Sequence, residues 1–508
     1  MNGTAAETSL MPTATQNAPA TAAPARAARR RATGPDWLWA ALLTLAVTAF
    51  RAGTPQLWRD ELASWNAASR STGELIGMLG HVDAVSGFYY LLLHYWVTLF
   101  GDSPAMLRLP SALAMAGSAA LVVLIARALF DRRTAVFAGL LFALLPAVTR
   151  YGTEARSYAF VVLAVTAATW LLLRVLERPS LPRWAGYAVL VAVSGLLHMV
   201  SLLFLLPHAM IVALRWWRAR RVRVPLSFAV AAVAGLLPVI PLVLLGRRQV
   251  GRQIAWIDTP HLRDVSGLWD NLFASPLVGL AVAALALLPL AWPRGRRPAV
   301  EMLLMGAVPI GACFVASQGS SSYFIDRYVL FTVPAWAILA AAGLAALRPR
   351  AAGAAGLAAL ILLGAPDQRQ LRTEQAKETS DGVAAARVIA QGYRPGDGFV
   401  PPRGKLERVF MIDYQIGYYL PDRVKLRDVF AERPAVASDD LFPVECGQPE
   451  RCLGDTRRIW LVTRITDGDH DPYNKLPAAP KKALKEHYRI ARTTDVRGLH
   501  VSLLERVK

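Results

Sequence analysis

The chain has 508 residues, of which 54% are hydrophobic, and its formal net charge is +20. The apolar residues are concentrated before residue 366, in recurring runs suited to a hydrocarbon core of about 30 Å. Arginines lie in the short segments between these runs, as in positive-inside orientation, so the charge does not indicate nucleic-acid binding. The composition predicts an integral membrane protein that contacts lipids, some of them through anionic headgroups.

The N-terminal part predicts a tail, a first span and a long external loop. Residues 1–34 are rich in Ala, Thr, Pro and Arg, which predicts a disordered basic tail on the cytoplasmic side. The apolar run 37–50 then leads outward. Residues 58–104 are mixed, and their one apolar stretch, 88–100, is short for a span. We therefore expect residues 58–104 to form the first external loop.

Further apolar runs alternate with short turns as far as residue 365. Counting them gives about eleven spans and places nearly every Arg-rich turn inside. Another external loop, residues 246–275, carries four arginines against this pattern. Either these arginines bind an anionic partner, or the count of spans is off by one. The predicted fold is an α-helical polytopic membrane domain over residues 35–365.

Residues 366–508 have frequent charges and only short apolar runs. The segments RRIWLVTRI and LHVSLLERV are typical of strands, and DGVAAARVIAQGY is typical of a helix. These patterns predict a small α/β domain, which the alternation of spans places outside the cell membrane. Cys446 and Cys452 flank a polar turn there and could form a disulfide in an oxidising compartment. A metal site is less favoured, because no further Cys completes it.

Two adjacent carboxylates, Asp60 and Glu61, follow the first span directly. One of them could accept a proton from an attacking hydroxyl group. Alternatively, both could be carboxylates that the dipole of a following helix stabilises.

Three later clusters fall on the same predicted face of the membrane and contain arginine. Guanidinium groups bind phosphate oxygens in a fork and remain charged. Each arginine alone could be an interfacial residue that extends to water, but together they predict a site for a lipid phosphate. The candidate residues of these clusters are Arg108, Glu154, Arg156, Tyr158, Arg327 and Tyr328.

Three histidine and carboxylate positions leave further possibilities open. His81 and Asp83 could bind a divalent metal ion with Glu61, or they could be solvated loop residues. His198 stands at a turn between two apolar runs, where it could line a polar cavity.

The order of these motifs resembles the GT-C superfamily of membrane glycosyltransferases. The resemblance covers residues 37–350 and includes the carboxylate pair after the first span, the RLPSAL segment, the YGTEARSY turn and a late Arg-Tyr before a Pro-containing helix. It is greatest to glycosyltransferase family 39 and its bacterial relatives, which include protein O-mannosyltransferases and aminoarabinose transferases of lipid A. Relatives often carry His-Pro-Pro where this chain reads HVDAVSGFYY, and this departure weakens a metal or acceptor role for that loop.

The resemblance implies a multi-pass enzyme of the plasma membrane that uses a polyprenyl-phosphate-linked sugar, with mannose as the leading expectation. It implies an inverting transfer in which Asp60 is the base, with Glu61 beside it, while Arg156 and Arg327 lie near the donor phosphate. The acceptor could be a protein, a lipid or a glycan. The sequence identifies no cofactor with certainty and leaves a divalent metal ion at His81 and Asp83 open.

Two other functions fit a chain with many spans. A transporter or flippase of lipid-linked sugars would also carry polar residues near helix ends, but transporters tend to have internal repeats, and we find none in this sequence. A structural scaffold of the cell envelope would tolerate the loss of Asp60.

Overall fold

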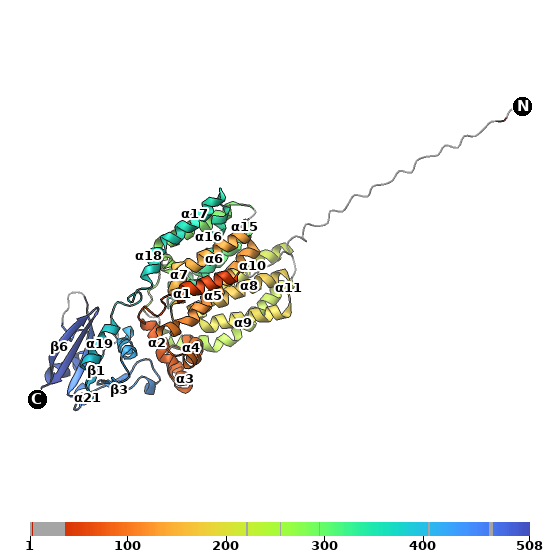
Figure 1. Ribbon diagram of the computed structural model, residues 1–508. Helices are drawn as coiled ribbons and strands as arrows, with labels where there is room; N and C mark the ends of the chain where they lie inside the picture. Colours follow the sequence, from red (N-terminus) through yellow and green to blue (C-terminus); the bar gives the residue numbers. More distant parts are fainter. Residues whose placement is uncertain are drawn as a thin grey trace. The chain divides into compact units, whose positions relative to one another are not determined.

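The computed structural model describes residue 3 and residues 36–219, 222–253, 256–293, 295–404, 407–466 and 471–507. The predicted disordered tail, residues 1–34, lies outside the described residues apart from Gly3. The described residues between 37 and 370 form helices and their connections, and a sheet-containing region follows them (Figure 1). This arrangement confirms the predicted fold class.

The helical part consists of helices that run side by side together with shorter helices at one end (Figure 1). Their bounds are α1 Leu38–Ala49, α2 Arg59–Ala68, α3 Thr72–His81, η2 Ala84–Ser86, α4 Gly87–Phe100, α5 Pro104–Leu129, α6 Arg132–Leu144, α7 Pro146–Gly152, α8 Tyr158–Glu177, α9 Leu181–Leu197, η3 Met199–Phe204, α10 Leu205–Ala219, α11 Arg223–Leu236, η4 Leu237–Val239, α12 Ile240–Gln253, α13 Asp264–Phe273, α14 Pro276–Leu287, η5 Leu288–Ala291, α15 Arg296–Ala316, η6 Asp326–Thr332, α16 Val333–Ala346, α17 Arg350–Leu363 and α18 Ala365–Gln370.

The predicted count of about eleven spans is not confirmed. Within the described residues, six helices are long and apolar enough to cross a membrane, and two bent pairs, α6 with α7 and α13 with α14, raise this number to eight. Four shorter apolar helices include α1, α9 and α17, which lie where the sequence predicted spans. An α-helix rises about 1.5 Å per residue, so the 12 residues of α1 fall short of a hydrocarbon core of about 30 Å.

Local sequence signals set where several of these helices begin. The hydroxyl of Ser103 accepts the backbone N–H of Met106 at the start of α5, and Pro104 fills the first helical position. Asp131 caps α6 in the same manner. Side-chain caps satisfy N–H groups that a helix leaves without a partner at its first turn.

Close approaches between neighbouring helices require glycine, as two examples show. A Cβ atom on Gly343 of α16 would lie 2.2 Å from the carbonyl oxygen of Leu285 in α14. A Cβ atom on Gly235 of α11 would lie 2.5 Å from the carbonyl oxygen of Ala188 in α9. Small residues of this kind allow membrane helices to pack closely.

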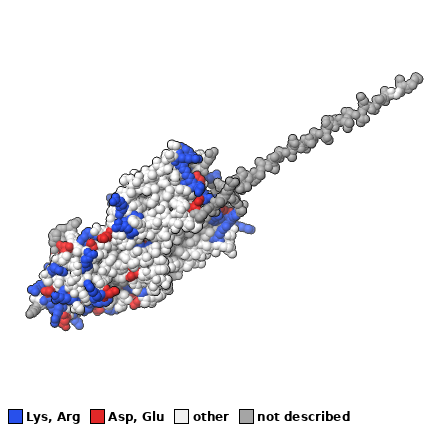
Figure 2. Space-filling view, viewed as in Figure 1, with Lys and Arg blue, Asp and Glu red and all other residues white. Residues whose placement is uncertain are grey.

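The distribution of charge agrees with a membrane domain. Figure 2 shows a broad face over the helices without Lys, Arg, Asp or Glu, and it shows charged residues gathered at the ends of that face. Such a face suits contact with lipid tails, because a charged side chain at the bilayer centre costs about 3 kcal/mol on insertion scales.

The C-terminal region contains a mixed five-stranded sheet. Strand β1 pairs in parallel with β2 and β5, whereas β7 pairs antiparallel with β5 and β6, and β3 pairs antiparallel with β4 in a second sheet. The predicted helix and both predicted strands correspond to α19, β5 and β7. The bounds are α19 Gly382–Gly392, β1 Gly398–Val400, η7 Arg408–Phe410, α20 Ile412–Tyr419, β2 Arg427–Asp428, β3 Ala431–Arg433, η8 Val436–Ser438, β4 Val444–Glu445, α21 Pro449–Leu453, β5 Arg458–Arg464, α22 Ala478–His487, β6 Tyr488–Val496 and β7 Leu499–Arg506.

The C-terminal region contacts the segment that follows α1. The side chain of Gln56 donates to Asp381 at 2.8 Å, and the backbone N–H of Leu57 donates to the hydroxyl of Tyr419 at 2.9 Å. These contacts fix the chain immediately before α2, which carries the predicted catalytic carboxylates.

Candidate functional site

A fully buried ion pair anchors the start of α2. The Nε and Nη2 atoms of Arg108 in α5 donate to the two carboxylate oxygens of Glu61, each at 2.7 Å. Arg108 also donates to the carbonyls of Ala52, Pro55 and Gln56 at 2.7, 2.8 and 3.2 Å. A guanidinium group has five N–H donors, and every one of them has a protein acceptor here. This geometry corrects the prediction that Arg108 binds a phosphate, since it has no donor left for one.

Glu61 is held from two further directions. The backbone N–H of Ala155, which follows α7, donates to Glu61 Oε1 at 3.0 Å, and Lys377 Nζ lies 3.8 Å from the same oxygen. Burial alone would raise the pKa of Glu61, but the charges of Arg108 and Lys377 and the hydrogen bonds from Arg108 and Ala155 bring it below its ordinary value. Glu61 is therefore an ionised carboxylate that ties α2 to α5 and to the turn after α7.

Asp60, the neighbouring carboxylate, has a different environment. Its side chain is 19% exposed, with Oδ2 lying 3.7 Å from Arg327 Nη1 and Oδ1 lying 3.8 Å from Arg59 Nε. These distances are too long for hydrogen bonds but keep two positive charges close. The Asp60 oxygens thus have lone pairs available for a proton from another group.

Aromatic rings surround the Arg327 guanidinium at the start of η6. Its Cζ atom lies 5.5 Å from the ring centroid of Trp256 and 5.9 Å from those of Trp58, Tyr158 and Tyr328. Its Nε atom is buried and has no hydrogen-bond partner among the described residues. Because buried N–H groups nearly always have an acceptor, this donor is suited to an oxygen atom of a bound ligand.

A second cation, Arg59, shares two of these rings. Its Cζ atom lies 5.9 Å from the Trp58 centroid and 5.7 Å from that of Trp256. We call Arg59, Arg327, Trp58 and Trp256 the guanidinium cradle. Sequence reasoning missed Arg59 and both tryptophans. The WRDE segment offered the only signal for Trp58 and Arg59, whereas Trp256 lies in the predicted loop 246–275 and belongs to no motif.

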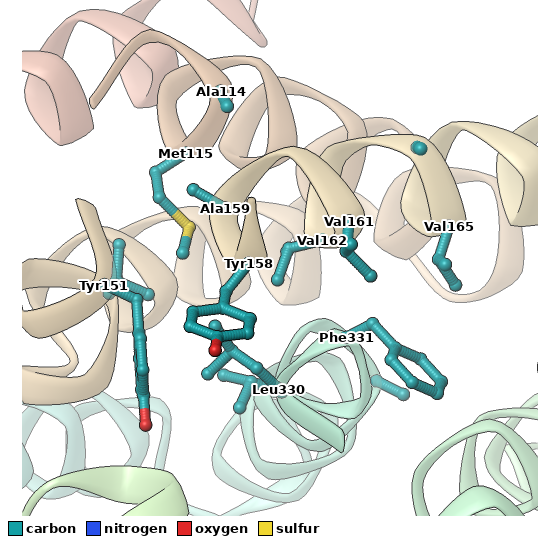
Figure 3. Packing of buried hydrophobic residues seen from close by; sticks show 14 of the residues in the cluster. Ala114, Met115, Tyr151, Tyr158, Ala159, Val161, Val162, Val165, Leu330 and Phe331 are labelled. Carbon is teal, nitrogen blue, oxygen red and sulfur yellow. The ribbon is translucent and has the colours of Figure 1, made fainter. Parts of the chain in front are cut away.

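The other predicted aromatic residues pack together behind the cradle. The ring of Tyr158 lies 6.4 Å from that of Tyr328 and 5.9 Å from that of His198. Figure 3 shows the rings of Tyr151 and Tyr158 within a cluster of buried apolar residues, and their centroids lie 6.1 Å apart. The Tyr151 hydroxyl donates to Asp326, beside Arg327. The structure thus brings Tyr158, Tyr328 and His198 to the cradle.

Arg156 belongs to a neighbouring polar network. Its Nη1 atom donates to the hydroxyl of Tyr90 at 2.9 Å, and its Nη2 atom donates to Ser86 Oγ at 3.4 Å. Both of these hydroxyls donate in turn to Asp83. The Cζ atom of Arg156 also lies 6.0 Å from the ring centroid of Tyr158, which contacts Arg327 as well. Arg156, the second arginine that the sequence predicted to bind phosphate, therefore lies at the edge of the guanidinium cradle.

The residues considered for a metal site do not fit one. His81 is exposed, and its Nδ1 atom lies 3.0 Å from the carbonyl oxygen of Gly77, whereas Asp83 belongs to the Arg156 network and Glu61 to the Arg108 pair. Throughout the part of the chain that the structure describes, there is no group of three or more His, Cys, Asp or Glu residues that could hold a metal ion.

Glu154 and Lys377 form a buried pair next to Glu61. Lys377 Nζ lies 4.0 Å from Glu154 Oε2 and donates to the carbonyl of Thr153. Burial raises the pKa of Glu154 to about 7 and lowers the pKa of Lys377 to about 8. Sequence reasoning missed Lys377, because its segment RTEQAKETS has no motif and lies more than 200 residues from the turn that it contacts.

The two remaining predicted residues lie apart from this site. Cys446 and Cys452 are joined by a disulfide in the C-terminal region, at the end of β4 and within α21. The bond closes a short ring, which would stabilise the fold by roughly 2 kcal/mol in the chain-entropy picture.

The sequence and the fold are similar to those of known proteins. The model of the dolichyl-phosphate-mannose-protein mannosyltransferase family matches residues 87–244. No curated protein matches the chain. Among solved structures, ArnT from Cupriavidus metallidurans in the apo state is similar with a TM-score of 0.60 and 16% identity, over 91% of this chain and 97% of ArnT. ArnT bound to undecaprenyl phosphate is similar with a TM-score of 0.55 and 16% identity, over 91% and 98% of the two chains.

The comparisons test the family resemblance that the sequence motifs indicated. The family match extends from α4 to the first residues of α12 and includes the YGTEARSY turn. The structural match covers nearly the whole of both chains. At 16% identity the structural match shows the fold. The predicted resemblance to the GT-C membrane glycosyltransferases is confirmed.

Proposed function

We propose that this chain, which has the fold of the GT-C membrane glycosyltransferases, transfers a sugar from a polyprenyl-phosphate donor to a hydroxyl group of an acceptor. The observation that carries this proposal is the contact between Asp60 and Arg327. A carboxylate without hydrogen bonds to its neighbours lies 3.7 Å from a guanidinium that has an unpartnered buried N–H. A proton acceptor and a phosphate-binding group thus stand side by side.

The guanidinium cradle is the proposed site of the donor phosphate. Arg327 and Arg59 would bind the phosphate oxygens with charge-assisted hydrogen bonds, and Arg156 would add positive charge from the network with Tyr90. As the bond between the anomeric carbon and the phosphate oxygen breaks, that oxygen takes the electron pair. Preorganised cations in a site with little water stabilise this growing charge.

Asp60 is the proposed general base. The acceptor oxygen attacks the anomeric carbon and loses its proton to the Asp60 carboxylate. The sugar passes through a state with oxocarbenium character, as in glycoside chemistry. Attack from the face opposite the phosphate inverts the configuration of the anomeric carbon. Glu61 and Arg108 do not take part in these steps; they fix the helix that presents Asp60.

The relatives support the class of donor. The matching family model is described as a dolichyl-phosphate-mannose-protein mannosyltransferase, and one ArnT structure contains undecaprenyl phosphate. Mannose on a polyprenyl phosphate is therefore the first donor to test, with a protein, lipid or glycan hydroxyl as the acceptor. A transporter or flippase of lipid-linked sugars is not favoured, because the sequence and fold similarities are both to transferases.

The proposed site also implies an orientation in the plasma membrane. We place the guanidinium cradle and the C-terminal domain on the extracytoplasmic side and the N-terminus in the cytoplasm. This orientation puts most of the Arg-rich turns on the inner side and the disulfide in an oxidising compartment.

A radiolabel experiment tests the proposed function. Membranes containing the full chain are incubated with polyprenyl-phosphate sugars labelled in the sugar, beginning with mannose, and the labelled products are sized. We expect label to move from lipid to a larger or more polar product. Membranes with the Asp60→Asn variant are the control, and equal transfer in both samples would contradict the proposal.

A further inference from the structure

A polar pocket lies next to the guanidinium cradle. Its volume is about 420 Å³, which is within the range of about 300–1,000 Å³ for small-molecule sites. Four separate segments form its walls: the start of α2, the turn after α7, the bend between α13 and α14, and the chain after α17. Its lining includes Trp58, Glu154, Asp270, Asn271, Ala376 and Lys377.

Two buried polar atoms of the lining residues have no hydrogen-bond partner in the part of the chain that the structure describes. Glu154 is 3% exposed, and its Oε1 atom lacks a donor. The indole Nε1 of Trp58 is also buried and lacks an acceptor. Buried polar atoms in folded proteins are almost always paired. Because a hydroxyl group both donates and accepts, a ligand with several hydroxyl groups could pair with both atoms.

The charges of the pocket favour a neutral ligand over an anion. Lys377 and Arg150 contribute positive charge to the lining, whereas Glu154, Asp270 and Asp367 contribute carboxyl groups. A phosphate in the pocket would lie beside these carboxyl groups, which repel it when they are ionised. A phosphate in the cradle would instead lie beside the cations Arg59 and Arg327. The pocket also has an indole, whose apolar ring and N–H group suit an amphipathic ligand.

We propose that this pocket binds a sugar ring and is a sugar subsite separate from the phosphate-binding cradle. The inference rests on the proposed function, which supplies the phosphate and the base next to it. Trp58 joins the two places, since it lines the pocket and its ring centroid lies 5.9 Å from Arg327 Cζ. The ring is either the sugar of the donor or a sugar of the acceptor, and both present the same hydroxyl chemistry.

The segment after α17 closes the pocket and is firmly attached. Gln368 accepts from Thr149 at 2.8 Å and donates to the carbonyl of Leu144 at 2.9 Å. Arg372 donates to the carbonyl of Val47 at 2.8 Å. The wall that contains Lys377 is therefore held against α1, α6 and α7, so the subsite is part of the fold in the absence of ligand.

Alkylation of a single cysteine tests the subsite without requiring turnover. Ala376 is a half-buried lining residue, so Ala376→Cys places a small thiol in the wall of the pocket. The native cysteines give little background, because Cys313 is buried and the other two form the disulfide. The rate of maleimide labelling of the full-length, detergent-solubilised chain is measured with polyprenyl phosphate, polyprenyl-phosphate mannose or methyl mannoside, and then with the glucose, galactose and arabinose counterparts.

We expect at least one sugar-bearing compound to slow labelling by about tenfold at saturation, while polyprenyl phosphate alone has no effect. Protection by the lipid-linked sugar only assigns the subsite to the donor, and protection by the methyl glycoside only assigns it to the acceptor. The matched control is Ala478→Cys, an exposed position in α22, whose labelling should be the same in every sample. Asn271→Leu, which removes an exposed amide from the lining, should weaken the protection of Ala376→Cys.

The inference is overturned if no sugar-bearing compound slows labelling, or if polyprenyl phosphate alone slows it as much. The failure of the subsite and the failure of the proposed function give different results. Sugar transfer without protection of the Ala376→Cys thiol would disprove the subsite but not the proposed function. Protection of the thiol without any sugar transfer by the wild-type chain would support the subsite and contradict the proposed function.

Discussion

Glu61 and Arg108 bind each other through two hydrogen bonds of 2.7 Å, and both side chains are 0% exposed. Asp60, one residue earlier, has neither of these bonds. Successive residues of an α-helix point about 100° apart, since a turn contains about 3.6 residues. The first turn of α2 therefore directs Asp60 toward the guanidinium cradle and Glu61 into the protein. This division separates the structural role of Glu61 from the chemical role that we propose for Asp60.

The buried pair should be essential for stability. Replacing one partner leaves an unpaired buried charge, which typically costs about 3–5 kcal/mol. We therefore expect Arg108→Met to lower the unfolding temperature of the purified protein sharply, while Arg263→Met, whose side chain is 81% exposed, has almost no effect. The double variant Arg108→Met with Glu61→Leu should recover part of the loss. An unchanged unfolding temperature in Arg108→Met would contradict the role assigned here.

The loss of Asp60 should affect turnover and not folding. Asp60→Asn keeps the size of the side chain and removes the proton acceptor, so the transfer rate should fall by about 100-fold or more. The unfolding temperature should stay close to that of the wild type. Asp264→Asn is a matched control, because Asp264 also stands in the first turn of a helix beside an arginine. Transfer at a similar rate in Asp60→Asn and Asp264→Asn would exclude Asp60 as the base.

Much of the helical fold could be predicted from the sequence, because apolar runs in a membrane protein have few alternative structures. The apolar runs that begin at residues 106 and 158 correspond to α5 and α8, which begin at Pro104 and Tyr158. The run that begins at residue 328 starts within η6, and α16 begins five residues later, at Val333. The bends between α6 and α7 and between α13 and α14 were not predicted. Composition does not distinguish a straight span from a broken one, and their angles of 54° and 97° depend on packing.

The candidate site was predictable only where a motif marked it. Asp60, Arg156 and Arg327 belong to short patterns with a recognisable order along the chain. Trp256 and Lys377 do not, and they reach the site through contacts over long sequence distances. The individual roles of Glu61 and Arg108 were also hidden, because a sequence lists donors and acceptors without showing which of them are already paired.

Arg327 should contribute mainly to the chemical step. If its guanidinium stabilises charge on the leaving phosphate, Arg327→Gln should lower kcat by about 10²–10³-fold, with a smaller change in KM. Arg327→Lys should recover part of kcat, since it restores a charge but not the buried Nε–H. Kinetics with varied concentrations of the lipid-linked sugar measure both constants. A change confined to KM would mean that Arg327 binds the ground state and the transition state equally well and does not stabilise the transition state selectively.

Glu154 should make stability depend on pH in a defined direction. Burial raises its pKa from 4.5 to about 7, so the folded chain binds this proton more tightly than the unfolded chain does. The resulting stability is complete below the unfolded pKa and is lost as the pH rises through the folded one. The unfolding temperature should therefore fall between about pH 5 and about pH 7.5, and Glu154→Gln should reduce this fall.

The pH range of that measurement lies below the range in which a second buried group, Lys377, affects stability. Burial lowers the pKa of Lys377 from 10.5 to about 8, so the unfolded chain binds the extra proton between these values and stability from this group rises with pH there. The two effects thus have opposite signs in different windows. If Glu154→Gln and the wild type lose stability equally across the lower window, the buried carboxyl is not the cause.

The proposed orientation predicts which cysteines a membrane-impermeant maleimide reaches. Ala478→Cys lies exposed in the C-terminal domain, and Arg350→Cys lies exposed where α17 begins, at the other end of that helix from the segment that contains Lys377. In intact cells we expect labelling at position 478 only, and labelling at position 350 after permeabilisation. In parallel, peptides prepared from the native envelope without reduction should contain Cys446 linked to Cys452. The opposite labelling pattern would place the cradle in the cytoplasm, where a donor carried at the outer face of the membrane could not reach it.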